Sequence, residues 1–445
     1  MIIKTLAMMV TAVWLAGNCI THAAEKSARP NIIFIISDDQ AWSDYGFMGH
    51  PQLATPHLDK LAAESLTFQR GYTPAPLCRP SLSSIVTGLY PHQHGVTGND
   101  PELPVKGITS LAGRSNPKYQ RYYQTIIDNF AKRPNLVRDL TSSGYVSFQT
   151  GKWWEGDPVT TAGFSHAMTV GTGKGDRHGG KGLEIGRQGL QPIKDFIGEA
   201  GDKPFLVWYA PMLPHDPHNP SAELLAKYKK LTPSEPVAAY WGNVEWFDQT
   251  CGDLMDYLEQ KGLRDNTIIL FTTDNGYVQD PQKANRFAPR SKLTPYEGGV
   301  RTPIMISWPA KLKPRMDTEH LASTVDFWPT LAALLQTETP KGLPGINLAD
   351  EQAVAKRSRV FGEQSTHSIA DVDDPNRSLE YRWMVDGWWK LIAPDPRNHP
   401  DAKPQLYDLK NDPWEKTDLS ATQPEKVKSL SKEMNQWWQP VETKN

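Results

Sequence analysis

The chain has 445 residues, too many for one small domain and enough to bury a large hydrophobic core. Its 48 lysines and arginines nearly balance its 50 aspartates and glutamates, so its charge gives no reason to expect binding to nucleic acid or to an anionic membrane. Three cysteines are too few for a disulfide framework.

The N-terminus has the layout of a cleaved export signal. One lysine precedes an apolar run, and small residues follow at Ala23 and Ala24. The run is shorter than the ~20 residues that a membrane-spanning helix needs, although a membrane anchor is the alternative. We therefore expect residues 1–24 to be a signal peptide cut near Ala23/Ala24. The mature protein is then periplasmic or secreted, without stable membrane insertion.

Apolar runs and helical patterns alternate through the first three quarters of the chain. Four runs predict buried strands that each end in polar residues: 31–39, 144–154, 203–218 and 266–276. Helices are predicted between them and after them: 55–68, 238–262 and 327–336. This alternation indicates an α/β fold with a large, mostly parallel sheet flanked by helices. Ligands of such sheets bind beyond the carboxyl ends of the strands, so the polar strand ends predict one shared site.

The pattern changes after residue 343. Residues 343–358 suggest a loop or linker, and residues 380–392 and 404–415 predict antiparallel strands with turns at Asp386-Gly387 and Asn411-Asp412. A last helix is predicted over 424–438. We therefore expect a catalytic domain over 25–350 and a smaller α+β subdomain over 351–445.

Acidic residues follow two of the predicted strands. Asp38 and Asp39 close the first strand, and Asp274 and Asn275 close a later one. Each pair alone is typical of a turn or helix cap. Together, at equivalent strand ends, their oxygens are the hard ligands that bind calcium or magnesium rather than zinc.

Cys78 stands just before a predicted helix. Pro80 fits the first turn of a helix from Ser81, whose free amides and partial positive charge then point toward Cys78 and suit a tetrahedral anion. Lys152, Lys292 and His215 lie in loops that could reach it. The residues indicate an anion site with a nucleophile and a hard cation.

Cys251, within a helical pattern, is expected to be a small buried residue. A bridge between Cys251 and Cys78 is the alternative, because an oxidising compartment permits it.

The stretch from Cys78 to Gly88, "CRPSLSSIVTG", resembles the signature of the type I sulfatases, in which Cys-x-Pro-Ser opens the nucleophile helix and Thr-Gly closes it. Further blocks match that family in the right order over nearly the whole chain after the signal. They are "SDDQ", "TGKW", "PHDPH", "TTDNG", "SKLTPYEGGVRTP", "DFWPT" and "LYDLKNDPWE". The chain is thus similar to the formylglycine-dependent sulfatases of the alkaline phosphatase-like superfamily.

This resemblance implies a modified nucleophile and a metal. In the family, a formylglycine-generating enzyme oxidises the cysteine to an aldehyde. One hydroxyl of its hydrate attacks sulfur, and loss of the proton from the other then expels sulfate. Carried over by motif, Asp38, Asp39, Asp274 and Asn275 hold one Ca²⁺ together with an oxygen at the position of Cys78.

The same resemblance implies roles for the basic residues. Lys152 binds the sulfate, while His215 and Lys292 contact the sulfate and the bridging oxygen, and either supplies the proton to the leaving alcohol. The implied substrate is a sulfate ester. Export and tryptophan-rich loops favour a sulfated carbohydrate, as in polysaccharide degradation, although Trp153 and Trp154 fit a protein core equally well.

The sequence departs from the family pattern at two positions. Leu82 stands where the family has an arginine, four residues after the cysteine, and Trp154 stands where it often has a histidine that serves as a base. The arginine also belongs to the signal that the modifying enzyme reads. These replacements remove a positive charge and a proton acceptor from the pocket.

Three interpretations follow from these departures. The favoured one is a sulfatase with a reorganised base, in which His94, His166, Arg177 or His178 substitutes; His94 and His178 are the candidates for substrate binding. The second is a phosphate or phosphonate ester hydrolase that uses the same type of site. The third is a binding protein for sulfated glycans in which Cys78 is never converted.

Overall fold

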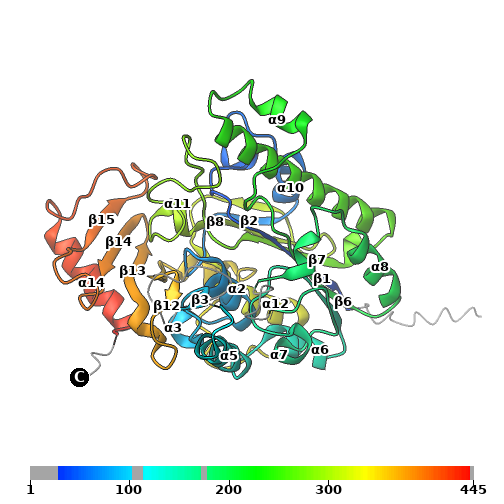
Figure 1. Ribbon diagram of the computed structural model, residues 1–445, viewed down its shortest axis with the longest axis horizontal. Helices are drawn as coiled ribbons and strands as arrows, with labels where there is room; N and C mark the ends of the chain where they lie inside the picture. Colours follow the sequence, from blue (N-terminus) through cyan, green and yellow to red (C-terminus); the bar gives the residue numbers. More distant parts are fainter. Residues whose placement is uncertain (1–28, 103–113, 172–177, 441–445) are drawn as a thin grey trace, which may run out of the picture.

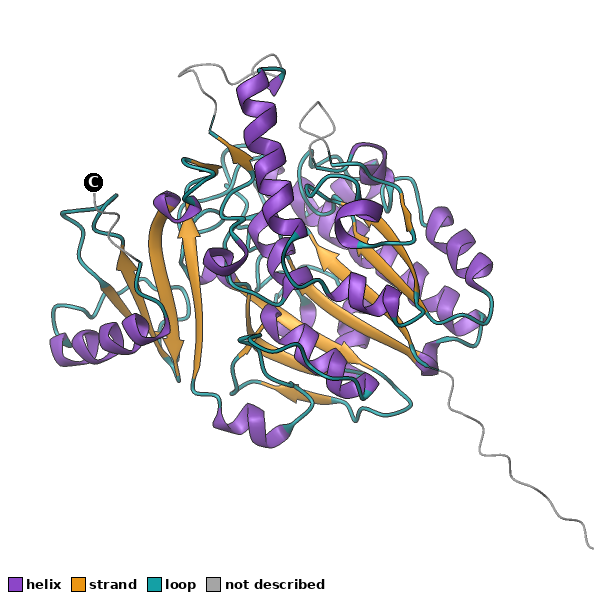
Figure 2. Ribbon diagram, turned by 90° about the horizontal axis from the view of Figure 1, so that it is seen from below, coloured by secondary structure: helices purple, strands orange, loops and turns teal. Residues whose placement is uncertain are grey.

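The computed structural model describes residues 29–102, 114–171 and 178–440. In these ranges a large sheet carries helices on both faces, and a smaller sheet with one covering helix lies beside it toward the C-terminus (Figures 1 and 2). The predicted fold class, a mostly parallel sheet with a smaller antiparallel sheet plus helix, is confirmed.

The central strand β1 (Asn31–Ser37) is buried along its whole length. It pairs in parallel with β6 on one side and β7 on the other. Because side chains alternate along a strand, Ile32, Phe34 and Ile36 join one hydrophobic core while Ile33 and Ile35 join the core on the other face. This explains why the strand is apolar at consecutive positions.

The large sheet has nine strands among the described residues, in the order β10-β2-β8-β7-β1-β6-β4-β5, with β9 beside β2. Strand β8 runs antiparallel to β2 and β7, and the other pairs are parallel. Besides β1, the strands are β2 (Leu66–Tyr72), β4 (Val146–Gly151), β5 (His166–Ala167), β6 (Phe205–Ala210), β7 (Thr267–Thr273), β8 (Arg301–Ser307), β9 (Arg315–Asp317) and β10 (Ala322–Ser323).

Helices cover both faces of this sheet (Figure 2). Residues of α2, α5, α6 and α12 form one core with the sheet, and residues of α1, α8 and α10 form the other. The helices are α1 (Pro56–Ala63), α2 (Cys78–Thr87), α3 (Pro91–His94), α5 (Pro117–Ala131), α6 (Leu136–Ser142), α7 (Pro158–Ala162), α8 (Gln191–Ala200), α9 (Ala222–Tyr228), α10 (Glu235–Gln260), α11 (Glu297–Val300), α12 (Phe327–Leu335), α13 (Glu351–Lys356) and α14 (Pro424–Trp437).

The second sheet is antiparallel, in the order β11-β13-β14-β15. One face packs against α14 through Leu391 and Met434, and the other packs against Tyr72 and Val300 of the large-sheet region. Its strands are β11 (Arg359–Ser365), β13 (Leu379–Asp386), β14 (Trp389–Pro394) and β15 (Gln405–Asp408); a separate short pair consists of β3 (Asp100–Pro101) and β12 (Ser368–Ile369).

Several details differ from the sequence-based expectations. The segment 343–358, predicted as a loop, contains α13, which Asp350 caps by accepting from the backbone N–H groups of Gln352 and Ala353. The turn near Asn411 follows β15 but leads into no second strand in the described chain. Cys78 and Cys251 are both free and buried in different cores, so the alternative of a bridge between them is wrong.

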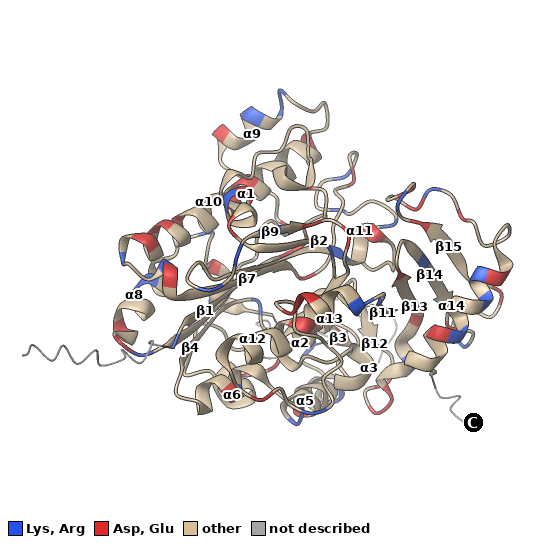
Figure 3. Cartoon of the chain, turned by 180° about the vertical axis from the view of Figure 1, so that it is seen from behind, with Lys and Arg blue, Asp and Glu red and all other residues tan. Residues whose placement is uncertain are grey.

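The outer helices α8, α9 and α14 carry both acidic and basic positions (Figure 3). Within the described ranges, no helix combines the length and the apolar character required to span a bilayer.

Candidate active site

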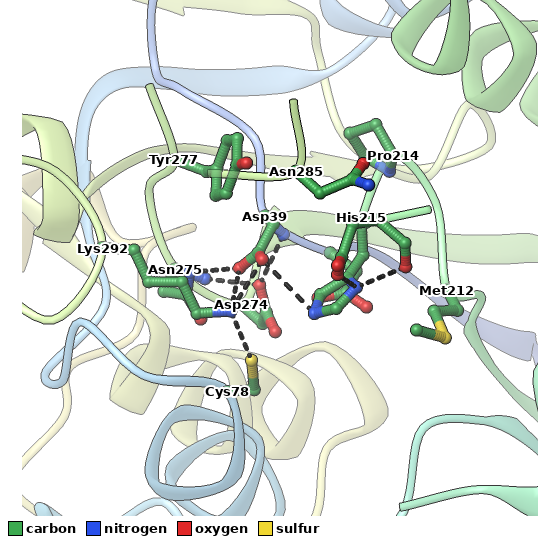
Figure 4. Close-up of polar contacts among 12 residues, drawn as sticks. Asp39, Cys78, Met212, Pro214, His215, Asp274, Asn275, Tyr277, Asn285 and Lys292 are labelled. Atoms are coloured by element: carbon green, nitrogen blue, oxygen red, sulfur yellow. Dashed lines mark hydrogen bonds and ion pairs between the residues drawn. The ribbon is translucent and has the colours of Figure 1, made fainter. Parts of the chain in front are cut away.

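Four strand ends of the large sheet bring the predicted polar residues together, and Figure 4 shows six of the site residues: Asp39, Cys78, His215, Asp274, Asn275 and Lys292. Asp38 follows β1, Lys152 follows β4, His215 lies beyond β6, and Asp274 follows β7. Ligand atoms of Asp38, Asp39, Cys78 and Asp274 all lie within 4.8 Å of one another, and all four residues are buried. The expectation of one shared site at the carboxyl edge of the sheet therefore matches the geometry.

Cys78 lies at the first position of α2, three residues earlier than the predicted helix start at Ser81. Leu77 is extended at the N-cap and Pro80 lies in the first turn, where its missing N–H costs no hydrogen bond. The side-chain oxygen of Asn99 accepts from the backbone N–H of Arg79. The helix ends at Gly88, whose φ of 68° is the left-handed conformation that glycine accepts most easily.

Two lysines approach the sulfur of Cys78 from different loops. Lys152 Nζ lies 3.4 Å from Cys78 Sγ and donates to Asp38 Oδ1 at 2.7 Å. Lys292 Nζ lies 3.3 Å from the same sulfur and donates to both carboxylate oxygens of Asp39, at 2.7 and 2.6 Å. An anion beside position 78 would thus meet two ammonium groups whose positions are already fixed.

The charges in this buried cluster alter one another's protonation. Burial opposes the charge on Lys292, but the surrounding acidic groups, Asp39 first among them, together outweigh burial and raise the pKa of Lys292. Burial alone would raise the pKa of Asp39, yet Lys292 and His215 hold it well below its usual value. Burial, together with the neighbouring Asp38, raises the pKa of Asp274. Burial also raises the pKa of the Cys78 thiol, so an unmodified thiol is a poor nucleophile at this position.

The donor set fits a hard divalent cation. Asp38 Oδ2, Asp274 Oδ2 and Asn275 Oδ1 are buried and lack a hydrogen-bond partner among the described residues. The Asn275 amide is oriented by its Nδ2, which donates to Asp39 Oδ1 at 2.7 Å, so its oxygen is left for another partner. Buried oxygens without partners are costly, and a calcium-type ion with oxygen ligands would satisfy all three.

His215 lies at the edge of the cluster. Its Nε2 is 3.4 Å from Asp39 Oδ2 and its Nδ1 is 2.6 Å from Asp216 Oδ1. The side chain is 17% exposed, so it faces both the buried charges and solvent. Asp216, which orients the ring, was missed by the sequence analysis, although it lies within the quoted block "PHDPH".

The substitute residues proposed from the sequence are not all near the site. His94 is fully buried under α2, where its Nε2 is 3.0 Å from Ser84 Oγ and its Nδ1 accepts from the Val96 N–H. Its expected contact with substrate is therefore wrong. His166 is exposed on β5, and Arg177 lies outside the described residues. His178 packs edge-on against Trp154, with ring centroids 5.3 Å apart.

Leu82 and Trp154 are core residues, 6% and 2% exposed, in the same hydrophobic core as Cys78. Trp153 is equally buried, so neither tryptophan of this loop presents a sugar-stacking face. Behind them Arg79 and Glu155 form a buried ion pair that the sequence analysis missed. The only sequence signal for it is position: Arg79 lies within the block "CRPSLSSIVTG", and Glu155 lies two residues after "TGKW".

Comparison with known proteins shows the fold and the family of this chain. The fold is alkaline phosphatase-like, and one solved structure that shares it is the phosphonate monoester hydrolase of Agrobacterium radiobacter, with a TM-score of 0.65 and 18% identity over 92% of this chain and 95% of that one. Residues 30–337 match the sulfatase family, and residues 290–442 match the family described as N-sulphoglucosamine sulphohydrolase, C-terminal. The chain belongs to the sulfatase family, the sulfuric ester hydrolases.

Two relatives illustrate the extent of the similarity. The N-acetylgalactosamine-6-O-sulfatase of Bacteroides thetaiotaomicron is 26% identical, and the alignment covers 92% of this chain and 93% of that protein. The human N-acetylgalactosamine-6-sulfatase is 27% identical over 72% of this chain, and the chain spans 65% of its length.

Proposed function

We propose that this protein is an exported sulfatase that hydrolyses a sulfate ester of a carbohydrate, with formylglycine made from Cys78 and one bound Ca²⁺. The observation that carries the proposal is the convergence of two lysines and the unpartnered oxygens of Asp38, Asp274 and Asn275 on position 78. Positive groups that meet at a helix N-terminus suit a tetrahedral anion.

Each basic residue has a distinct part in this proposal. Lys152 and Lys292 bind the sulfate oxygens, because their ammonium groups lie within 3.4 Å of the sulfur at position 78. His215 is the candidate proton donor to the leaving alcohol, since its partly exposed ring lies beside Asp39 and is held by Asp216. His178, next to Trp154, is a candidate for contact with the sugar.

The cation would be held by Asp38, Asp39, Asp274 and Asn275. When bound, calcium and formylglycine supply charge neutralisation and a nucleophilic oxygen, respectively. The division into a signal (1–24), a catalytic domain (25–350) and a C-terminal subdomain (351–445) is part of the same proposal.

The test begins with the mass of the peptide that contains residue 78, isolated from the native host so that a formylglycine-generating enzyme is present. We expect the mass of formylglycine or its hydrate. The same protein should release inorganic sulfate from sulfated saccharides, of which 6-O-sulfated N-acetylgalactosamine is the first to assay because of the relatives' names. Release should stop after chelation and return with Ca²⁺.

The control is Cys78→Ala, which removes the modified side chain and should abolish turnover. Preferential hydrolysis of an aryl phosphate or a phosphonate would replace the proposal by the second interpretation. An unmodified Cys78 together with binding of sulfated glycans but no turnover would replace it by the third.

A further inference from the structure

The two apolar residues that depart from the family pattern share one small pocket between α2 and the loop that carries Lys152. Leu82 and Trp154 both line it, together with Phe130, and the ion pair of Arg79 and Glu155 forms another part of its wall. The positions where the family pattern has an arginine and often a histidine are therefore occupied here by an alkyl chain and an indole. Any part that Trp154 plays must come from its ring.

The ring of Trp154 lies against Lys152. The distance from Lys152 Nζ to the ring centroid is 5.3 Å, within the range of a cation–π contact. An ammonium group has three N–H donors, and among the described residues its hydrogen-bond partners are Asp38 Oδ1 and Cys78 Sγ. Lys152 is 2% exposed, so the charge is shielded from water, which strengthens its attraction to the negative ring face.

Trp154 is itself held in place. Tyr123 donates its hydroxyl to the Trp154 carbonyl at 3.1 Å, and the next residue, Glu155, is fixed by Arg79. The backbone of Trp154 also packs tightly on Gly171, where a Cβ would approach the Trp154 Cα within 3.0 Å. The indole is therefore a rigid surface against which a flexible lysine side chain can be oriented.

We propose that Trp154 is a positioning residue that acts through Lys152: its indole face holds the ammonium group in place between Asp38 and position 78. This rests on the proposed function, in which Lys152 binds sulfate. An indole face neither accepts nor releases a proton, so Trp154 replaces the family histidine as an orienting group and not as a base.

The test compares tryptophans at position 154 that carry increasing numbers of fluorine atoms, introduced at that site alone. Fluorine weakens the attraction of the ring face for a cation and changes the shape of the ring little. The readout is the affinity for inorganic sulfate, measured by calorimetry, together with kcat/KM on a sulfated saccharide. We expect the affinity for sulfate to fall with each added fluorine, by about tenfold over the whole series. Trp154→Leu should lose about tenfold as well, whereas Trp154→Phe should keep most of the affinity.

The matched control is the same series at Trp153. That ring is also 2% exposed but packs on Phe164 and Trp208, with centroid distances of 5.5 and 6.2 Å, and among the described residues no cation lies over it. A merely structural role predicts equal effects at both positions. The proposal would be overturned by equal losses of sulfate affinity at positions 153 and 154, or by the absence of a trend at position 154. It would also be overturned if the protein with its original tryptophans did not bind sulfate.

The two proposals fail in different ways. A trend in sulfate affinity without hydrolysis of any sulfate ester would overturn the proposed function and leave the role of Trp154 intact. Hydrolysis of a sulfate ester without the trend in sulfate affinity would support the proposed function and overturn the role of Trp154.

Discussion

Arg79 and Glu155 form a bidentate ion pair directly behind Cys78, with Arg79 Nε 2.7 Å from Glu155 Oε1 and Nη2 2.8 Å from Oε2. The two side chains are only 1% and 4% exposed. The pair joins the first turn of α2 to the loop that carries Lys152, so it fixes the distance between the nucleophile position and one of its lysines.

Removing one partner of this pair should be strongly destabilising. In Glu155→Gln the guanidinium of Arg79 stays buried without a counter-charge, and we expect the free energy of unfolding to fall by about 3 kcal/mol. Denaturant titration measures the change. The control is Glu259→Gln, because Lys60 and Glu259 form an exposed pair at 3.1 Å and its loss should cost less than about 1 kcal/mol. If both variants lost a similar amount of unfolding free energy, burial of the Arg79–Glu155 pair would not be the cause of the larger effect.

The pattern of strand ends was sufficient to predict much of the site. Asp38 and Asp274 follow continuous apolar runs, and such runs are buried strands whose carboxyl ends meet at one edge of a parallel sheet. The ion pair of Arg79 and Glu155 follows from no such rule, because its partners are 76 positions apart and each alone resembles a surface charge.

The same limit applies to the fold. The predicted helix 55–68 is wrong at its end, because α1 ends at Ala63 and residues from Leu66 onward form β2. Strand β8 was not predicted, since polar residues in "RTPIMIS" break the apolar run. His94 was misplaced for a related reason: a histidine in a loop-like sequence resembles a surface residue, and only the packing of α2 over α3 buries it.

His94 should make the fold sensitive to acid. Burial, together with the nearby charges of His92 and Arg133, lowers the pKa of His94 from 6.5 to about 3. Its Nδ1 must stay unprotonated to accept from the Val96 N–H. Below pH 6.5, His94 therefore binds a proton in the unfolded state but not in the folded state. This group's contribution to stability is fully present above pH 6.5 and is lost as the pH falls toward 3.

His94→Asn tests this, because the asparagine oxygen can accept from Val96 and does not titrate. The loss of unfolding free energy between pH 6.5 and 4 should be smaller in this variant by on the order of 3 kcal/mol. His166→Asn is the control, because it makes the same exchange at an exposed histidine on β5. An unaltered profile in His94→Asn would show that other groups cause the acid sensitivity.

Calcium should stabilise the protein, because only the folded chain gathers the carboxylates. At 100 times its Kd, a ligand of the folded state adds about 2.7 kcal/mol, which a rise in Tm would report. Asp274→Asn should abolish the rise. Its oxygen can still accept from the Asp39 and Asn275 N–H groups, but an amide NH₂ replaces the free oxygen Oδ2.

Asp248→Asn is the matched control for the calcium response. Asp248 is also buried, but its oxygens accept from the backbone N–H groups of His57 and Leu58 on the far side of the sheet from Cys78. Calcium should raise the Tm of this variant as it does that of the original protein. A calcium response that survives in Asp274→Asn would place the ion elsewhere.

Replacing Leu82 by the arginine of the family pattern should destabilise the folded protein. Leu82 is 6% exposed and faces a pocket that it shares with Phe130 and Trp154. A guanidinium in that pocket would be buried beside Arg79, and the nearby carboxylate of Glu155 already accepts two hydrogen bonds from Arg79. Leu82→Arg should therefore lower the free energy of unfolding by about 3 kcal/mol, whereas the volume-conserving Leu82→Met should cost less than about 1.5 kcal/mol. Denaturant titration could instead find Leu82→Arg as stable as Leu82→Met. The pocket would then accommodate a second cation, and the surrounding residues would not require an apolar side chain at position 82.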